Sequence, residues 1–225
     1  MTRYNSFYLI HKALRAMLYD TALTLQKTDF ADNAQSTIAM AKINDVLFAF
    51  DRHAYHEDSF IIPAVATYEP EVAASFEQEH EEDHLLAGYL KNLLNIFDNT
   101  YFSEERIICG SAIIKSFTEF VVFNLEHMAK EEILLNQALW KHYTDEQIMK
   151  KHQQLLATIP PVEMQSAAKW MIRSISTTDA INWLKHVKET APAFVFTNLL
   201  HIAQEEMTEL QFAILQEGIE ENIAA

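Results

Sequence analysis

The sequence predicts an all-α protein, in which an up-down four-helix bundle is followed by a C-terminal helical extension. Only three glycines and five prolines occur among 225 residues, whereas Ala, Leu, Glu, Lys, Gln and Met, which favour helix, are plentiful. Four long stretches place apolar side chains every three or four positions, which is the period of an amphipathic helix. Short polar links join these stretches, and four such helices most simply pack up and down against one another.

Each predicted helix has recognisable limits. The polar stretch TDFADN separates the first helix from the second, and Pro63 and Pro70 end the second because proline cannot continue a helix interior. DNTYFS forms the next link, and Ser103 with the acidic residues after it is typical of an N-cap and first turn. The four helices are expected at residues 4–27, about 34–62, 71–98 and about 103–143.

The chain changes character after Thr144, where the helical segments become shorter and prolines separate them. We therefore expect two domains, a bundle at residues 1–144 and a helical extension at 145–225 that packs on it. Gly218 is expected to end the last helix. The segments of the extension are expected at about 145–158, 161–175, 178–190 and 192–217.

Charge and cysteine content exclude several classes of protein. The net charge of −15 makes nucleic acid and anionic membranes poor partners, because phosphate contacts need clustered Lys and Arg. The single cysteine, Cys109, excludes an intrachain disulfide framework and a cysteine-based zinc site. We find no uninterrupted apolar run of membrane-spanning length and no signal-peptide pattern, so we expect a cytoplasmic protein.

Histidines lie on the apolar stripe of all four long helices, and three of these helices add a second ligand one turn away. An isolated HxxxE pair is more often a salt bridge, but here the pattern repeats. Because an antiparallel bundle brings the helix midpoints together, five imidazoles and two carboxylates can converge on two metal ions. Such mixed donors favour Fe, Mn or Zn over Mg or Ca. The candidate metal ligands are His11, His53, Glu57, His80, His84, His127 and Glu131.

Over residues 1–143 the chain resembles the hemerythrin-like, or HHE cation-binding, domain. The stretches that carry the resemblance are HKALRAML at His11, HAYHEDSFIIP at His53, EHEEDH at His80 and HMAKEEILL at His127. The resemblance implies a non-haem di-iron centre with an oxo or hydroxo bridge, in which Zn or Mn could replace iron.

The same resemblance implies a ligand for each position. His11 and His53 would bind one iron, and His80, His84 and His127 the other, while Glu57 and Glu131 would bridge the two. The iron with two histidines would keep a position open for O2 or another small ligand.

Three neighbouring positions leave alternatives open. Oxygen-carrying hemerythrins place the last acid five residues after its histidine, which is Glu132 here, but the wider family often has the spacing of Glu131. His56 shares a face with His53 and could replace a ligand, although we expect it outside the ligand set. In NLLHIAQEE, His201 and Glu205 repeat the HxxxE pattern; without further partners we expect an interhelical ion pair or a remnant of duplication there, and not a second metal site.

These expectations lead to three functional hypotheses. The first is a di-iron protein that binds or senses O2, or alternatively NO, peroxide or iron itself. The second is an oxidase or ferroxidase at the same site, which would consume O2 catalytically. The third is a metal-stabilised helical interaction module that works through its extension. A small-molecule ligand is the expected partner, and the amphipathic helices are compatible with a homodimer.

Overall fold

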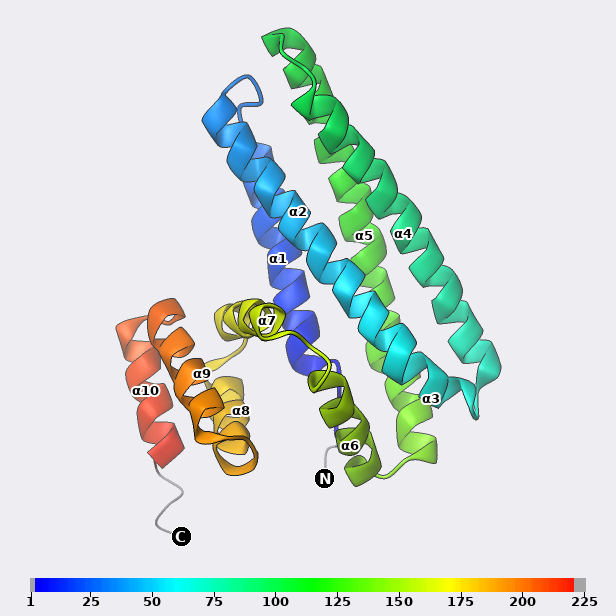
Figure 1. Cartoon of the computed structure of the whole chain (residues 1–225), viewed down its shortest axis with the longest axis vertical. Helices are drawn as coiled ribbons and strands as arrows, with labels where there is room; N and C mark the ends of the chain where they lie inside the picture. The colour runs from blue at the N-terminus through cyan, green and yellow to red at the C-terminus, as the bar shows by residue number, and fades with distance from the viewer. Residues whose placement is uncertain (1–2, 221–225) are drawn as a thin grey trace. The chain divides into compact units, whose positions relative to one another are not determined.

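The computed structural model describes residues 3–220, and these are almost entirely helical, with no β-strand among them (Figure 1). The predicted all-α class is therefore confirmed. The chain divides into two compact units. The first comprises the residues up to Tyr8 together with Met17–Thr158, and the second comprises Leu9–Ala16 together with the residues from Ile159 onward.

The long helices agree closely with the predicted ranges. Helix α4 contacts both α5 and α2. The first helix starts four residues later than predicted, because the side chain of Asn5 accepts hydrogen bonds from the backbone N–H groups of Phe7 and Tyr8 and forms a turn before it. The four helices are α1 (Tyr8–Lys27), α2 (Asn33–His56), α4 (Pro70–Asp98) and α5 (Ser103–His142).

The second predicted helix is interrupted by a π turn. Helix α2 ends at His56 and continues into the π-helix η1 (Glu57–Ile61) and then α3 (Ile62–Ala66). The N–H of Ile62 donates to the carbonyl of Glu57, five residues back. Pro63, which we expected to end the helix, instead lies in the first turn of α3. Proline has no N–H to continue the regular ladder, and the wider turn directly precedes it.

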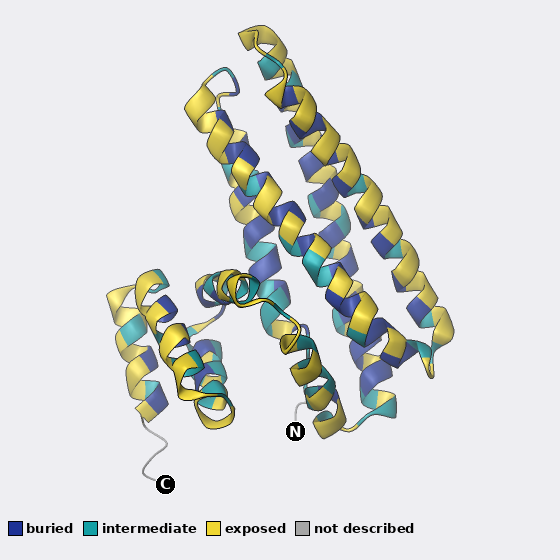
Figure 2. Ribbon diagram, in the orientation of Figure 1, coloured by how far each residue is buried: buried dark blue, intermediate teal, exposed yellow. Residues whose placement is uncertain are grey.

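Buried residues recur along each of the long helices (Figure 2). One apolar cluster lies next to the predicted metal ligands. Each of four members of this cluster stands four residues, or one helical turn, from a candidate ligand on the same segment. These members are Phe7, Ile61, Phe76 and Leu135. We call them the apolar layer; it borders the predicted site with side chains that exclude water.

Residues 145–220 form short helices, with α6 (Asp145–Leu156) grouped in the first unit and the rest in the second. The second unit has its own core, which includes Ala180, Leu184 and Ala203. The compact units separate after Thr158, one helix later than the predicted domain boundary after Thr144. The domain boundary itself stays a prediction. The helices of the second unit are α7 (Pro161–Ser174), α8 (Thr177–Thr190), α9 (Ala193–Glu206) and α10 (Glu209–Glu220).

The last predicted helix, 192–217, is in fact two. Thr208 begins α10 through reciprocal hydrogen bonds, in which its N–H donates to Gln211 Oε1 and its Oγ1 accepts from the N–H of Gln211. This arrangement is a capping box, and it ends the preceding helix. The expectation that Gly218 stops the last helix is wrong, because Gly218 lies within α10. A Cβ at Gly218 would stand 2.5 Å from Cδ1 of Ile181, so the glycine permits close packing.

By length and composition alone, α5 could cross a membrane. This segment did not stand out in the sequence, because charged residues interrupt it. A core helix of a soluble protein passes the same test, so this one helix carries little weight. Helix α5 also buries Asn124, His127 and Glu131 within the first unit.

Candidate metal centre

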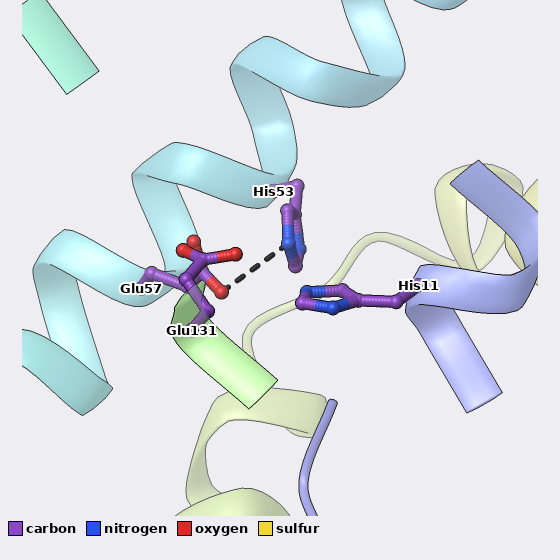
Figure 3. A group of neighbouring side chains, drawn as sticks. All are labelled: His11, His53, Glu57 and Glu131. Carbon is purple, nitrogen blue, oxygen red and sulfur yellow. Dashed lines mark ion pairs between the residues drawn. The ribbon is translucent and has the colours of Figure 1, made fainter. Parts of the chain in front are cut away.

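Two groups of side chains in the described chain are arranged so that each could hold a metal ion. In each group the four ligand atoms all lie within 4.8 Å of one another. The first ligand group contains His11, His53, Glu57 and Glu131, and Figure 3 shows its two imidazoles and two carboxylates directed toward one another. The second ligand group contains Glu57, His80, His127 and Glu131. Both glutamates belong to both groups.

The ligand groups lie in the interior. Glu131 and His11 are fully buried, and Glu57 is 2% exposed. Burying two carboxylates together costs several kcal/mol unless cations or hydrogen-bond donors compensate. The imidazoles supply part of this compensation, because His127 Nε2 lies 3.0 Å from Glu131 Oε1 and His53 Nε2 lies 3.2 Å from Glu57 Oε1. These two pairs are the HxxxE pairs of the sequence, in which histidine and glutamate stand one helical turn apart.

His80 points into the space between the two glutamates. Its Nε2 lies 3.4 Å from Glu57 Oε2 and 3.8 Å from Glu131 Oε1. This nitrogen is buried and makes no hydrogen bond within the described residues. A buried nitrogen in this position, facing two carboxylates, fits a metal cation as the missing partner.

The opposite ring nitrogens of two histidines are held by further carboxylates. Nδ1 of His80 lies 2.6 Å from Asp58 Oδ1, and Nδ1 of His127 lies 2.8 Å from Glu79 Oε2. Glu79 is itself paired with Lys130 at 2.8 Å. Neither carboxylate was predicted from the sequence. Asp58 could not be foreseen, since its orientation depends on the π turn, but Glu79 stands next to a predicted ligand and three residues after Phe76 of the same stripe.

The concentration of charge shifts the ionisation of these groups. Burial, reinforced by the neighbouring Glu131, raises the pKa of Glu57 well above its usual value, although His80 opposes the shift. Burial disfavours a charged His80, yet the carboxylates of Glu131, Glu57 and Asp58 outweigh it and raise the pKa of His80 to about 11. In His127 burial is likewise outweighed, by Glu131 and Glu79, so the pKa of that imidazole is also raised. Without a metal, protons therefore neutralise the cluster.

A small cavity adjoins both ligand groups. Its volume is about 10 Å³, which is room for roughly one water molecule. Two residues that line it, Asp83 and Asn124, were not predicted from the sequence. Both are buried, and Asp83 Oδ1 accepts a hydrogen bond of 2.7 Å from Nδ2 of Asn124. Burial raises the pKa of Asp83. The lining residues are Phe50, His53, Ala54, Glu57, His80, Asp83, Asn124, His127 and Met128.

Periodicity could have indicated these two residues. Asp83 follows His80 by three positions and Asn124 precedes His127 by three, so both share a face with a candidate ligand. The pairings that predicted the site join a histidine to a glutamate or to a second histidine at four-residue spacing, whereas these two residues stand three positions from their histidines.

The structure does not bring His84 to the other predicted ligands. Its side chain is 52% exposed, and its Nε2 lies 3.8 Å from Asp51 Oδ1. The buried stripe of α4 passes from His80 through Asp83 and Ala87 to Leu90, and this path leaves His84 at the edge of the helix. The difference is one of helical phase: the position three residues after His80, rather than four, faces the interior.

The alternative positions fall outside both ligand groups. Glu132 is only half-buried, whereas Glu131 belongs to both groups. His56 is buried, and its ring contacts Arg52 and Tyr55. His201 and Glu205 form an exposed pair at 3.3 Å within α9. The repeated HxxxE in the extension is therefore a surface ion pair within one helix, and not the interhelical pair that we had considered.

Six of the seven predicted residues thus meet in two groups that share their carboxylates. Two nitrogens and two oxygens face each position, and this donor set suits iron, manganese or zinc. No protein-family model, curated protein or solved structure matches this chain.

Proposed function

We propose that this protein binds two metal ions, natively iron, within a hemerythrin-like bundle formed by α1, α2, α4 and α5. The observation that carries the proposal is the sharing of Glu57 and Glu131 between two buried ligand groups. A glutamate has two carboxylate oxygens, so each can contribute one to either ion. Two adjacent cations also neutralise carboxylates whose joint burial would otherwise be costly.

The proposed ligand set differs from the one that the family resemblance implies. His11 and His53 serve one ion, and His80 and His127 the other, while both glutamates bridge. We leave out His84 because it is half-exposed and lies outside both groups. Both ions then have the same donors, two imidazoles and two carboxylates. Four donors leave either ion short of octahedral coordination, so both would have positions open for small ligands.

A pair of iron ions would supply the binding of small molecules such as O2, NO or peroxide, and the exchange of electrons with them. The protein's own residues control what reaches the ions. The apolar layer excludes water on one side, and the cavity beside the ligand groups has room for a molecule of only a few atoms. These features favour a diatomic or similarly small ligand over an organic substrate.

A second candidate is an enzyme that reduces its small ligand at the same site. The observation that favours it is Asp83, a buried carboxyl group on the cavity wall that could donate a proton. Measurement of O2 or peroxide consumption with an added reductant separates the two candidates. Turnover that falls in Asp83→Asn supports the enzyme, whereas binding and release without consumption supports the carrier or sensor.

Elemental analysis of protein purified without oxygen tests the metal proposal. We expect two ions per chain in the wild type and the loss of at least one in His127→Ala, because this imidazole is a ligand of the second group. Glu205→Gln is the matched control, since it breaks an exposed HxxxE pair and should leave both ions bound. Unchanged metal content in His127→Ala would contradict the assignment.

A further inference from the structure

The two histidines of the second ligand group are each contacted at both ring nitrogens. In both, Nε2 faces the bridging glutamates, at 3.4 Å from Glu57 for His80 and at 3.0 Å from Glu131 for His127. In both, Nδ1 is hydrogen-bonded to a carboxylate outside the ligand groups. Asp58 and Glu79, which provide these carboxylates, come from different segments, η1 and α4. The same arrangement therefore arises twice.

Asp58 contacts its histidine from within the π turn. Glu57 and Asp58 are consecutive residues, and in a regular α-helix consecutive side chains diverge by about 100°. Here they approach opposite nitrogens of one imidazole, at 3.4 Å and 2.6 Å. Isolated π turns occur often at functional sites, where they redirect side chains. In this chain the turn directs one carboxylate at the metal side of His80 and the next at its outer side.

Glu79 contacts helix α5 through both of its carboxylate oxygens. Its Oε2 contacts His127 Nδ1 at 2.8 Å, while its Oε1 accepts from Lys130 Nζ at 2.8 Å. Lys130 is on the same helix as His127, so α5 supplies both partners of the carboxylate. Glu79 is 22% exposed and His127 only 6%. The pair thus connects a buried ring to the surface through a carboxylate of fixed orientation.

We propose that Asp58 and Glu79 are positioning residues of the metal centre, which keep the proton of His80 and His127 on Nδ1 and thereby make Nε2 the metal-binding atom. A carboxylate that accepts from the outer nitrogen of a ligating histidine fixes the ring orientation and increases its basicity. The inference rests on the proposed function and extends it from the ligands to the residues that orient them.

The first test is metal affinity, measured with Zn²⁺ in competition with a chromophoric chelator. We expect Asp58→Ala and Glu79→Ala to weaken binding by about 10–100-fold. Asp58→Asn and Glu79→Gln should lose less, because the amide oxygen still accepts from Nδ1–H. Asp51→Asn is the matched control: it neutralises the acid beside His84, outside both ligand groups, and should bind like wild type.

The second test identifies the coordinating atom. In Zn²⁺-loaded protein with ¹⁵N-labelled histidine, NMR should show both rings protonated at Nδ1 and metal-bound at Nε2. Asp58→Asn should alter the Nδ1 proton signal of His80 and leave that of His127 unchanged, and Glu79→Gln should do the converse. A merely structural ion pair would change thermal stability without changing the zinc affinity or the Nε2 coordination of either ring. Coordination through Nδ1 would overturn the proposal.

The outcomes separate the two proposals. If the wild type binds two ions and the alanine variants bind them as tightly, the positioning role is wrong and the metal centre stands. If the wild type binds neither Fe²⁺ nor Zn²⁺, the proposal of a metal centre is wrong, and the positioning role, which depends on it, is wrong as well. Circular dichroism of the metal-free variants reports folding, and the amide variants keep the test decisive should an alanine variant fail to fold.

Discussion

At the scale of single residues, Gly110 is a position with no room for a side chain. A Cβ placed there would stand 2.2 Å from Cγ of Phe30. Phe30 cannot easily retreat, because Arg106 donates to its carbonyl oxygen and also to Ser36 Oγ. The guanidinium of Arg106 lies over the ring of Phe97, which packs edge-on against Phe30. Glycine is therefore required for the approach of this ring to α5.

We predict that Gly110→Ala lowers the free energy of unfolding by about 1–3 kcal/mol, because overpacking displaces a fixed ring. Gly88→Ala is the matched control. Gly88 is also within a helix, but a Cβ added there would meet nothing within 4 Å, so alanine should stabilise by about 0.5–1 kcal/mol through helix propensity. Urea unfolding measures both, and equal stabilisation by the two substitutions would contradict the packing argument.

Glu206 gives the second unit a dependence on pH. Its side chain pairs with Lys169 at 2.8 Å and with Arg173. Partial burial raises its pKa, but the two cations outweigh this and hold the pKa of Glu206 below its usual value. A carboxyl group with a depressed pKa stabilises the fold above its unfolded pKa, and this contribution is lost as the pH falls through the folded pKa.

We predict that Glu206→Gln lowers the free energy of unfolding at pH 7 by up to about 1 kcal/mol. The difference from wild type should diminish as the pH falls through the folded pKa of Glu206, because protonation removes the charge that pairs with the two cations. Urea unfolding at pH 7 and pH 3 measures it. Glu205→Gln, which changes the exposed neighbour, should show little difference at either pH. An effect of Glu206→Gln as large at pH 3 as at pH 7 would point to lost packing instead of lost charge.

At the scale of secondary-structure elements, the regular helices could be predicted and their interruptions could not. Periodicity gave α4 and α5 nearly to the residue, and it placed His53, Glu57, His127 and Glu131 on interior faces. Periodicity did not predict the π turn at η1, where the helix departs from 3.6 residues per turn. A π turn widens the helix locally without changing residue preferences, so η1 left no signal in composition. His84 differs for another reason: α4 is regular, and there the position three residues after His80, not four, faces the interior.

The break between α9 and α10 had a signal in the sequence that we overlooked. The stretch TELQ, residues 208–211, has the spacing of a capping box. Apolar residues continue on both sides of this stretch, and continuous apolar periodicity favours one helix over two, so the capping-box pattern does not stand out. Local hydrogen bonding of Thr208 with Gln211 decided the outcome, and tertiary packing then brought the two segments together in one core.

We predict that Thr208→Ala destabilises the second unit by about 1 kcal/mol, because the first turn of α10 loses its side-chain acceptor. Thr197→Ala is the control, since Thr197 lies inside α9 and its hydroxyl donates to the carbonyl of Ala193 within the same helix. That substitution should be neutral or slightly stabilising. Thermal unfolding by circular dichroism measures both, and an unaffected Thr208→Ala variant would show that the cap is dispensable.

At the scale of the whole molecule, helix α1 takes part in both compact units. Its residues Leu9–Ala16 are grouped with the second unit, where Leu9 packs on the apolar core and Lys12 pairs with Asp179 at 2.8 Å. A linear reading of the sequence could not foresee this, because it divides a chain only at one point. Residues from the beginning and the end of the chain build the second unit together.

This grouping changes how a truncation experiment should be interpreted. Removal of residues 159–225 would remove the apolar core on which Leu9 of α1 packs. We therefore expect the shortened chain to be less stable than the full chain even when its metal content is intact. Thermal unfolding together with elemental analysis separates the two effects. Lost metal in a shortened chain that remains folded would show that the removed residues support His11.

The π turn at η1 makes the site depend on chain length as well as on side-chain identity. It occupies one residue more than a regular turn would. Deletion of Ser59 would let the segment close into a regular α-helix with α2 and α3 nearly in their present phase, because a π turn holds one more residue than an α turn over about the same rotation. The change would then be concentrated in the turn itself, where Asp58 contacts Nδ1 of His80. The extra residue therefore bears on the direction of side chains within the turn, and the helices on either side do not need it to keep their faces toward the core.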